Sequence, residues 1–270
     1  MPLVSIGDAD LAVEVAGSGP PLLLVAGLGG RGEFWRPHVA PLAERFRVVL
    51  HDHRGTGGST RSEGPYSVAR LAADVLRLMD ALQIECADFV GHSTGGAIGQ
   101  HIALQAPHRL RRLVLSGTWC GPDATFLRVF ELRRRVLELG GARDYYALGA
   151  LLGFPASWLA AHPELLDRSL DDAVASFPGT AIELARLEAV TGHDLREQVG
   201  RIGVESLVLG ASDDLLTPEH FQRELAARMP RARLRMLPTG GHFFPRTRAD
   251  EYRDLVGAFL EEPVHEPRRA

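Results

Sequence analysis

The spacing of hydrophobic residues along the chain predicts strands that are buried on both faces. Several short runs are apolar almost throughout, as expected for strands of a covered parallel sheet. They are Leu22–Ala26, Val48–Leu50, Phe89–Val90, Leu113–Leu115 and Leu207–Leu209. Leu234–Leu237 is a further apolar segment. Residues 3–6 and 11–15, joined across Gly7 and Asp8, instead predict an antiparallel hairpin at a sheet edge.

Helical periodicity fills the segments between these strands. It covers residues 34–44, 68–82, 94–106, 218–229 and 247–260. This alternation predicts an α/β fold with a mostly parallel sheet and helices on both faces. Residues 121–190 differ, because helical periods follow one another there without a strand. We therefore expect an α/β core made of residues 1–120 and 191–270, and a helical cap made of residues 121–190.

Composition and charge narrow the expected partners. The 270 residues are 45% hydrophobic and 24% charged, and the formal charge of −4 is spread along the chain. Nucleic acid and membrane are therefore not expected as partners. No leader or bilayer-length apolar run is recognisable, so we expect a cytoplasmic protein that acts on a small-molecule substrate. The oligomeric state stays open, a homodimer being one of the options.

Residue types absent or rare in the chain exclude several chemistries. All 30 basic residues are arginine, which excludes a lysine Schiff base, a P-loop lysine and a Ser-Lys dyad. Cys86 and Cys120 show no metal-ligand spacing and are expected to pack as small hydrophobic residues. No His/Cys cluster suggests a metal, and no dinucleotide fingerprint is present, so we expect neither metal nor cofactor.

Ser93 is the candidate nucleophile. It lies in Gly91-His92-Ser93-Thr94-Gly95, after an apolar strand and before a helical segment. A serine on such a strand-to-helix turn needs small neighbours, which Gly91, Gly95 and Gly96 provide. At a helix N-terminus the Thr94 N–H can stabilise an oxyanion. The alternative, a turn that only serves packing, is disfavoured by this context.

The serine needs a base and an orienting carboxylate later in the chain. Asp213 and Asp214 both follow the strand at 207–209; we favour Asp214 as the acid and expect Asp213 to hydrogen-bond the turn. His242 follows the last apolar strand on a glycine-flanked loop and is the candidate base. His92 is expected to pack beside the site.

The second oxyanion donor is expected in the loop after the strand at 22–26. This loop, Gly27-Leu28-Gly29-Gly30, is built of small residues that let backbone N–H groups approach a substrate. The Leu28 N–H is the candidate donor.

These motifs, together with Asp52-His53-Arg54-Gly55-Thr56-Gly57-Gly58-Ser59, resemble the α/β-hydrolase superfamily along nearly the whole chain. Residues 26–30, 128–141, 154–158 and 211–216 look like the aminoacrylate hydrolases of pyrimidine breakdown, and less closely like 3-oxoadipate enol-lactonases. The resemblance implies an eight-stranded sheet, a four-helix cap and cofactor-free hydrolysis of a small ester, lactone, amide or carbamate-like bond.

The chain departs from many members at Ala26-Gly27, where they have His-Gly. A serine at position 93 also argues against haloalkane dehalogenases and epoxide hydrolases, which use aspartate there. The same triad can serve carbon–carbon bond hydrolysis, lyase chemistry or direct activation of water. Receptors on this fold are a further, disfavoured alternative, because no additional interaction domain is visible.

Arg133 is the candidate contact to an anionic substrate. On a helical wheel it falls among Phe126, Val129, Phe130, Val136 and Leu137. A guanidinium in such a position needs a partner, either a carboxylate of the cap, which we favour, or an anionic substrate. Trp119 and Phe243, which stand next to strand-end loops, are candidate pocket residues.

Overall fold

A computed structural model describes residues 1–62 and 64–262 and contains an eight-stranded sheet. Its strands are β1 Leu3–Ser5, β2 Asp10–Ala16, β3 Pro21–Val25, β4 Arg47–His51, β5 Ala87–His92, β6 Leu110–Ser116, β7 Ser206–Ala211 and β8 Ala232–Leu237. The spatial order is β1-β2-β4-β3-β5-β6-β7-β8. The first two strands pair antiparallel, and β2 also pairs antiparallel with β4, while all later pairs are parallel. The predicted edge hairpin and parallel sheet are therefore confirmed.

Helices cover both faces of the sheet. They are α1 Arg36–Ala43, α2 Val68–Ala81, α3 Thr94–Gln105, α8 Glu219–Arg228, α9 Phe244–Thr247 and α10 Ala249–Glu261, with short 3₁₀ turns at Gly32–Trp35, Pro107–Arg109 and Val199–Arg201. Alternate residues of one strand belong to different cores, as Leu23 and Leu24 of β3 show. Leu23 packs in the core that holds α2, α3 and α8, whereas Leu24 packs in the core that holds α1 and α10. This double burial explains the continuous apolar runs.

Two predicted helices begin later than the periodicity indicated. The segment expected as a helix from residue 34 opens with the 3₁₀ turn, and α1 follows only at Arg36, beside a proline at the helix start. The segment expected from residue 247 is interrupted at Arg248, whose φ of −128° and ψ of 43° are not helical. Thr247 there donates its hydroxyl to the Gly240 carbonyl, so this turn stays attached to the loop before it.

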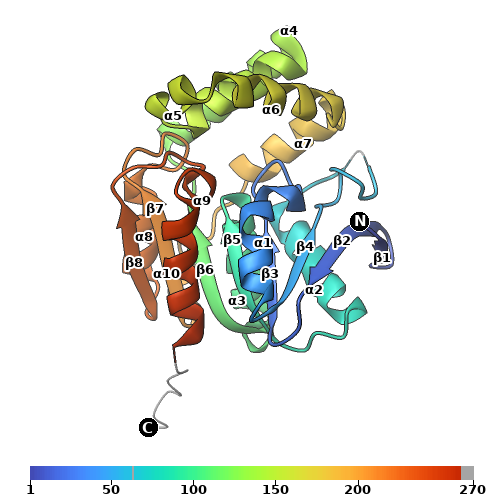
Figure 1. Ribbon diagram of the computed structural model, residues 1–270, viewed down its shortest axis with the longest axis vertical. Coiled ribbons are helices and arrows are strands. Elements are labelled where there is room, and N and C mark those ends of the chain that lie inside the picture. The colour runs from blue at the N-terminus through green and yellow to red at the C-terminus, as the bar shows by residue number, and fades with distance from the viewer. Residues whose placement is uncertain (63, 263–270) are drawn as a thin grey trace.

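A helical insertion lies between β6 and β7 and crosses the carboxyl edge of the sheet (Figure 1). It consists of α4 Ala124–Gly153, α5 Ala156–Ala161, α6 Pro163–Ala175 and α7 Thr180–Thr191. The long α4 changes direction at Gly141, where φ is 76° and ψ is −169°. Its two halves thereby face each other and α7, so the insertion has a small interior of its own.

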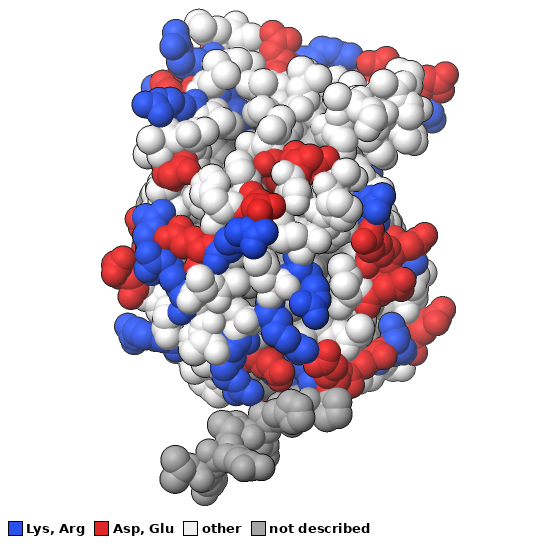
Figure 2. Space-filling view, turned by 90° about the vertical axis from the view of Figure 1, so that its left-hand side faces the viewer, with Lys and Arg blue, Asp and Glu red and all other residues white. Residues whose placement is uncertain are grey.

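The surface shows charges of both signs. On the face seen in Figure 2, arginine and acidic side chains are interspersed over the body of the molecule. Among the helices that the structure describes, none is long and apolar enough to cross a bilayer. Cys120 is buried as expected, but Cys86 is exposed, so the expectation that it packs as a hydrophobic residue is wrong.

Candidate active site

Ser93 occupies a strained turn between β5 and α3. Its φ of 55° and ψ of −118° lie in a region that residues with a side chain rarely adopt. The Ser93 N–H donates to the Ser116 carbonyl at 2.8 Å, and the Ser93 carbonyl accepts from the Gly96 N–H at 2.9 Å. The backbone on both sides of the turn is thus fixed, and the serine side chain is held at the carboxyl edge of the sheet.

Glycines around Ser93 allow the backbone to pack without intervening side chains. A Cβ on Gly91 would lie 2.2 Å from the Gly95 carbonyl oxygen. A Cβ on Gly95 would lie 2.1 Å from the carbonyl oxygen of Val25, at the end of β3. Both distances are far below van der Waals contact, so the sharp turn requires glycine at both positions.

His242 and Asp214 form a buried hydrogen-bonded pair. The His242 Nδ1 lies 2.8 Å from Oδ2 of Asp214, and their side chains are 5% and 0% exposed. Asp214 also accepts from the backbone N–H groups of Leu216 and Thr217 and from the Thr217 hydroxyl. A carboxylate only accepts, so Nδ1 carries the proton and Nε2 keeps a lone pair that can accept another.

Asp213, the alternative acid, makes different contacts. Its carboxylate accepts from the Gly240 N–H at 3.2 Å and the Gly241 N–H at 2.8 Å. It thereby ties the loop after β7 to the glycines that precede His242. The two adjacent carboxylates therefore make different hydrogen bonds. Asp214 bonds the imidazole, and Asp213 bonds the loop that carries it.

The loop after β3 approaches Ser93 closely. A Cβ on Gly27 would lie 3.1 Å from Cβ and 3.6 Å from Oγ of Ser93, so this loop borders the serine. Leu28 follows directly, and its side chain packs on the core. Thr94 is the first residue of α3, where a backbone N–H has no acceptor within its own helix. Both candidate oxyanion donors therefore belong to segments that flank Ser93.

His92 packs beside the pair, as expected. Its ring stacks on Phe34 with centroids 5.0 Å apart and lies 4.8 Å from the His242 ring. The His92 Nδ1 lies 3.2 Å from the Ser116 hydroxyl. Burial, and then the neighbouring His242, keep the pKa of His92 well below the usual histidine value. The imidazole is therefore neutral, and its role is to pack against the rings of Phe34 and His242.

Arg133 belongs to a buried hydrogen-bond chain inside the cap. Its Nη2 donates to the Tyr145 hydroxyl at 2.9 Å, and that hydroxyl donates to Glu183 Oε1 at 2.7 Å. The guanidinium also lies over the rings of Phe130 and Tyr145, at 5.2 and 4.8 Å. These contacts supply the internal partner that the sequence favoured, with a tyrosine placed between the two charges.

Trp119 and Phe243 occupy different surroundings. Trp119 is 1% exposed and packs against Phe126, with centroids 4.9 Å apart. Phe243 is partly exposed, lies 4.8 Å from the Phe154 ring of the cap and is 5.6 Å from the His242 ring. Phe243 therefore joins the histidine loop to the cap, while Trp119 contributes to the core beneath it.

Two polar residues near the candidate site were not anticipated. Thr217 bonds Asp214, and Arg186 of α7 donates to the Leu28 carbonyl at 2.5 Å. A helical wheel of residues 180–191 puts Arg186 between Ile182, Ala189 and Val190, the same signal that singled out Arg133. The contacts of Thr217 have no comparable signal in the sequence.

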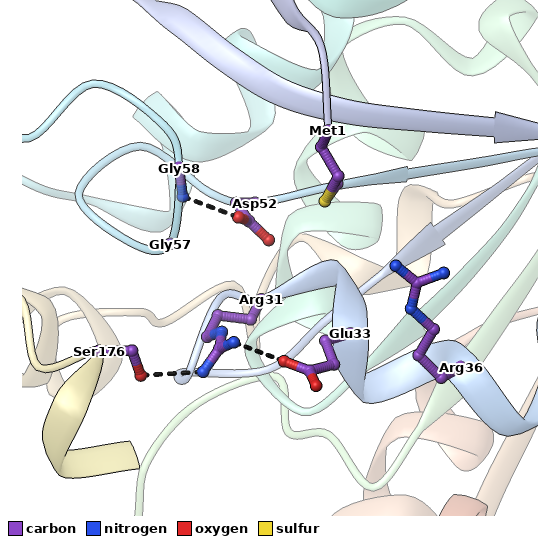
Figure 3. A pocket seen from close by; sticks show the side chains of 8 residues that line it. All are labelled: Met1, Arg31, Glu33, Arg36, Asp52, Gly57, Gly58 and Ser176. Carbon is purple, nitrogen blue, oxygen red and sulfur yellow. Dashed lines mark hydrogen bonds and ion pairs between the residues drawn. The ribbon is translucent and has the colours of Figure 1, made fainter. Parts of the chain in front are cut away.

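A cavity of about 430 Å³ lies at another part of the junction between core and cap (Figure 3). Its lining residues are Met1, Arg31, Glu33, Arg36, Asp52, Gly57, Gly58 and Ser176. Arg31 donates to Ser176 and to Glu33, and Asp52 accepts from Gly58. The cavity does not include the predicted site residues. Its charged groups have partners, since Arg31 pairs with Glu33 of the lining and Arg36 pairs with Glu14 outside it. Within residues 1–62 and 64–262, no group of three His, Cys, Asp or Glu could hold a metal ion.

Comparison with known proteins places this geometry in a family. The family model described as alpha/beta hydrolase fold matches residues 20–247. The chain is 39% identical over 262 residues to "Putative carbamate hydrolase RutD" of Azorhizobium caulinodans, covering 97% of this chain and 99% of the relative. It is also 39% identical to the protein of that name from Caulobacter sp. (strain K31), over 88% of this chain and 90% of the relative.

Solved structures agree with this assignment. The enol-lactonase from Burkholderia xenovorans LB400 superimposes with a TM-score of 0.89 at 29% identity, covering 97% of this chain and 100% of the other. A hydrolase from Pseudomonas aeruginosa PA01 gives 0.87 at 31% identity, with 97% and 98% covered. With the eight-stranded sheet and the helical insertion after β6, these matches establish that the chain belongs to the α/β-hydrolase family.

Proposed function

We propose that the protein is a serine hydrolase in which Ser93, His242 and Asp214 form a catalytic triad. The observation that carries the proposal is the 2.8 Å bond between Asp214 and His242, at the same sheet edge as the strained Ser93 turn. Asp214 fixes the tautomer with the proton on Nδ1, so His242 Nε2 can take the proton from Ser93 Oγ.

The reaction then has two halves. Ser93 Oγ attacks the substrate carbonyl carbon, and the Leu28 and Thr94 N–H groups hold the developing oxyanion. Collapse of the tetrahedral intermediate breaks the bond to the leaving group, which takes the proton from His242. A water molecule, deprotonated by His242, attacks the acyl group and releases Ser93. No external cofactor enters this sequence of steps.

The proposed substrates are small carbonyl compounds with a carbamate, ester, lactone or amide bond. Near full-length similarity to the proteins described as carbamate hydrolases favours a carbamate. The resemblance to aminoacrylate hydrolases adds a small carboxylate-bearing compound as a separate substrate to test. The enol-lactonase among the solved structures supports lactones as the next class to test. Phe34 stacks on His92, and Phe243 contacts the rings of His242 and Phe154. These aromatic rings suit a compact substrate with an apolar part.

A fluorophosphonate probe and a substrate panel test the proposal. The probe is expected to label Ser93, and Ser93→Ala is expected to abolish both labelling and turnover of carbamates, esters and lactones. Ser157→Ala, at an exposed serine of the cap helix α5, is the matched control and should retain both. Turnover that survives Ser93→Ala would contradict the mechanism, and cleavage of only carbon–carbon bonds would contradict the substrate class.

A further inference from the structure

Arg186 is a buried arginine of the cap that bonds to the core through two backbone carbonyls. It lies on α7 and is 2% exposed. Its Nη2 donates to the Leu28 carbonyl at 2.5 Å, and its Nη1 donates to the Arg54 carbonyl at 3.0 Å. The guanidinium also lies 5.9 Å from the centre of the Tyr66 ring. One planar group thus spans two loops that are separate in the sequence.

Burying this charge is unfavourable, so the contacts must offset a real cost. Burial lowers the pKa of Arg186, although arginine keeps its proton in proteins. Nε has no hydrogen-bond partner within the part of the chain that the structure describes. A buried charge that bonds to carbonyls, while the charge of Glu183 acts on it without an ion pair, is a poor choice for stability alone. The rigid fork of a guanidinium is, however, well suited to fixing the separation of two acceptors.

The two loops differ in rigidity. The Arg54 side chain is 1% exposed and makes two hydrogen bonds to the buried Asp74, at 2.8 and 2.7 Å. The Arg54 loop is therefore a firm anchor. The Leu28 loop is built of glycines around a single side chain, so its backbone has more conformational freedom. Arg186 consequently holds a glycine-rich loop against the Arg54 loop.

Glycine at position 30 leaves room for this contact. Gly30 has a φ of 66°, and a Cβ there would lie 2.7 Å from Arg186 Nη2. Its carbonyl accepts from the His53 N–H at 2.6 Å and from the Thr56 hydroxyl at 3.1 Å. The last residue of the loop is thereby attached to the same anchor segment, so the guanidinium fits between two backbone segments that are already close.

The rest of the cap fixes the position of α7. Glu183, one turn before Arg186, accepts from Tyr145 of α4, which in turn accepts from Arg133. Arg31, directly after the glycine loop, donates to the Ser176 hydroxyl of the cap at 2.8 Å (Figure 3). The glycine loop is thus connected to the cap at Leu28 and just beyond its end.

We propose that Arg186 is a positioning residue that orients the Leu28 peptide and so ties the oxyanion hole to the position of the cap. This inference rests on the proposed function, since it assigns a task to the Leu28 N–H. Arg186 acts through the backbone, because its bond to the Leu28 carbonyl fixes the Leu28–Gly29 peptide. The preceding Gly27–Leu28 peptide, which carries the Leu28 N–H, is held by the bond from the Gly30 N–H to the Gly27 carbonyl at 2.9 Å. With the peptides on both sides of Leu28 held, its N–H keeps its direction toward the oxyanion. Its loss should weaken binding of the transition state more than binding of the substrate.

The test compares Arg186→Met with a matched control, Arg112→Met. Arg112 is also 1% exposed and also donates to two backbone carbonyls, those of Leu260 and Glu262, but it lies near the amino end of β6. Both variants should lower thermal stability. At a temperature where each is folded, Arg186→Met should lower kcat roughly 100-fold with KM changed less than about threefold, and Arg112→Met should leave kcat unchanged.

A trifluoromethyl ketone that forms the tetrahedral adduct gives a second measurement. Its affinity should fall about as much as kcat in Arg186→Met and stay unchanged in Arg112→Met. In Arg186→Ala, added guanidinium ion should restore part of kcat. Wild-type kcat and ketone affinity in Arg186→Met would overturn the inference, as would an equal loss in both variants.

Two further variants keep the outcome decisive. If Arg186→Met does not fold, Arg186→Lys, which keeps the charge but lacks the planar fork, should show the same fall in kcat with KM retained; wild-type kcat there would overturn the inference. Ser93→Ala separates the two proposals. If it stays active, the proposed function fails. If it is inactive while Arg186→Met is normal, only the role of Arg186 fails.

Discussion

The Asp214 carboxylate lies 2.8 Å from His242 Nδ1, and both side chains are almost completely buried. The residue before it, Asp213, reaches the same histidine loop through Gly240 and Gly241. Neighbouring acids therefore act on one loop by different means. One bonds the imidazole ring, and the other bonds the backbone that carries it.

Replacing the two acids separately should give different kinetic losses. Asp214→Asn leaves the volume unchanged but favours the wrong histidine tautomer, so kcat should fall roughly 10³- to 10⁴-fold. Asp213→Asn keeps one acceptor for the glycine N–H groups, and kcat should fall no more than about tenfold. Steady-state kinetics on one small ester measures both variants.

Thermal unfolding provides the control for this pair. Asp213→Asn should lower the unfolding temperature, because it loosens a loop. Expressed as free energy, this loss of stability should be at least as large as the loss calculated from kcat. An equal loss of kcat in the two variants would contradict the division of roles and would reopen the choice between the two acids.

The glycines of the Ser93 turn should contribute strongly to the stability of the fold. Gly95→Ala would put a Cβ 2.1 Å from the Val25 carbonyl oxygen, and the strand and the helix would have to move apart. We expect a loss of about 3 kcal/mol in the free energy of unfolding, measured by urea titration. Gly203→Ala is the control, because nothing lies within 4 Å of the new Cβ. Similar stability for both variants would contradict this close packing.

The sequence predicted the candidate triad because its signals are local. Ser93, Asp214 and His242 each follow a strand of the sheet, and parallel strands end at one edge. The partners of Arg186 and Arg133 could not be predicted in the same way. Arg186 meets a carbonyl 158 positions earlier, and Arg133 meets Tyr145 only because α4 changes direction at Gly141. A helical wheel shows that a side chain is buried, but it does not show against what.

The Arg133 chain should contribute to cap stability rather than to substrate selection. Arg133→Met leaves the buried Tyr145 hydroxyl with one partner fewer and removes the positive charge from the chain that ends at the buried Glu183, so the free energy of unfolding should fall by about 3 kcal/mol. The ratio of kcat/KM for a carboxylate-bearing ester to that for its neutral methyl ester should not change. A ratio that falls tenfold or more would instead assign Arg133 to an anionic substrate.

Removing one hydroxyl tests the same chain without removing a charge. Tyr145→Phe separates Arg133 from Glu183 and should cost about 2 kcal/mol. Tyr146→Phe is the matched control, since the Tyr146 hydroxyl makes no hydrogen bond within the described chain. An equally small loss in the free energy of unfolding for both variants would show that the bonds of Tyr145 do not stabilise the cap.

Buried histidines should make the protein sensitive to mild acid. Burial lowers the pKa of His38 and of His51 to about 4, and that of His193 to about 3, against 6.5 when exposed. Between pH 6.5 and 4 the unfolded chain therefore binds protons that the folded chain does not. Stability rises with pH in this window and is lost as the pH falls, by roughly 1.4 kcal/mol per pH unit for each such histidine.

Replacing a single buried histidine isolates its contribution to the slope of unfolding free energy against pH. The His38 Nε2 lies 2.7 Å from the Pro245 carbonyl, so the neutral ring donates there and a glutamine amide can replace it. His38→Gln should reduce the slope of unfolding free energy against pH, measured by urea titration between pH 6.5 and 5, by about one proton. The same change at the exposed His108 is the control and should leave the slope as it is. An unchanged slope in His38→Gln would show that the ring is protonated in the folded protein, and its bond to Pro245 would then be a charged one.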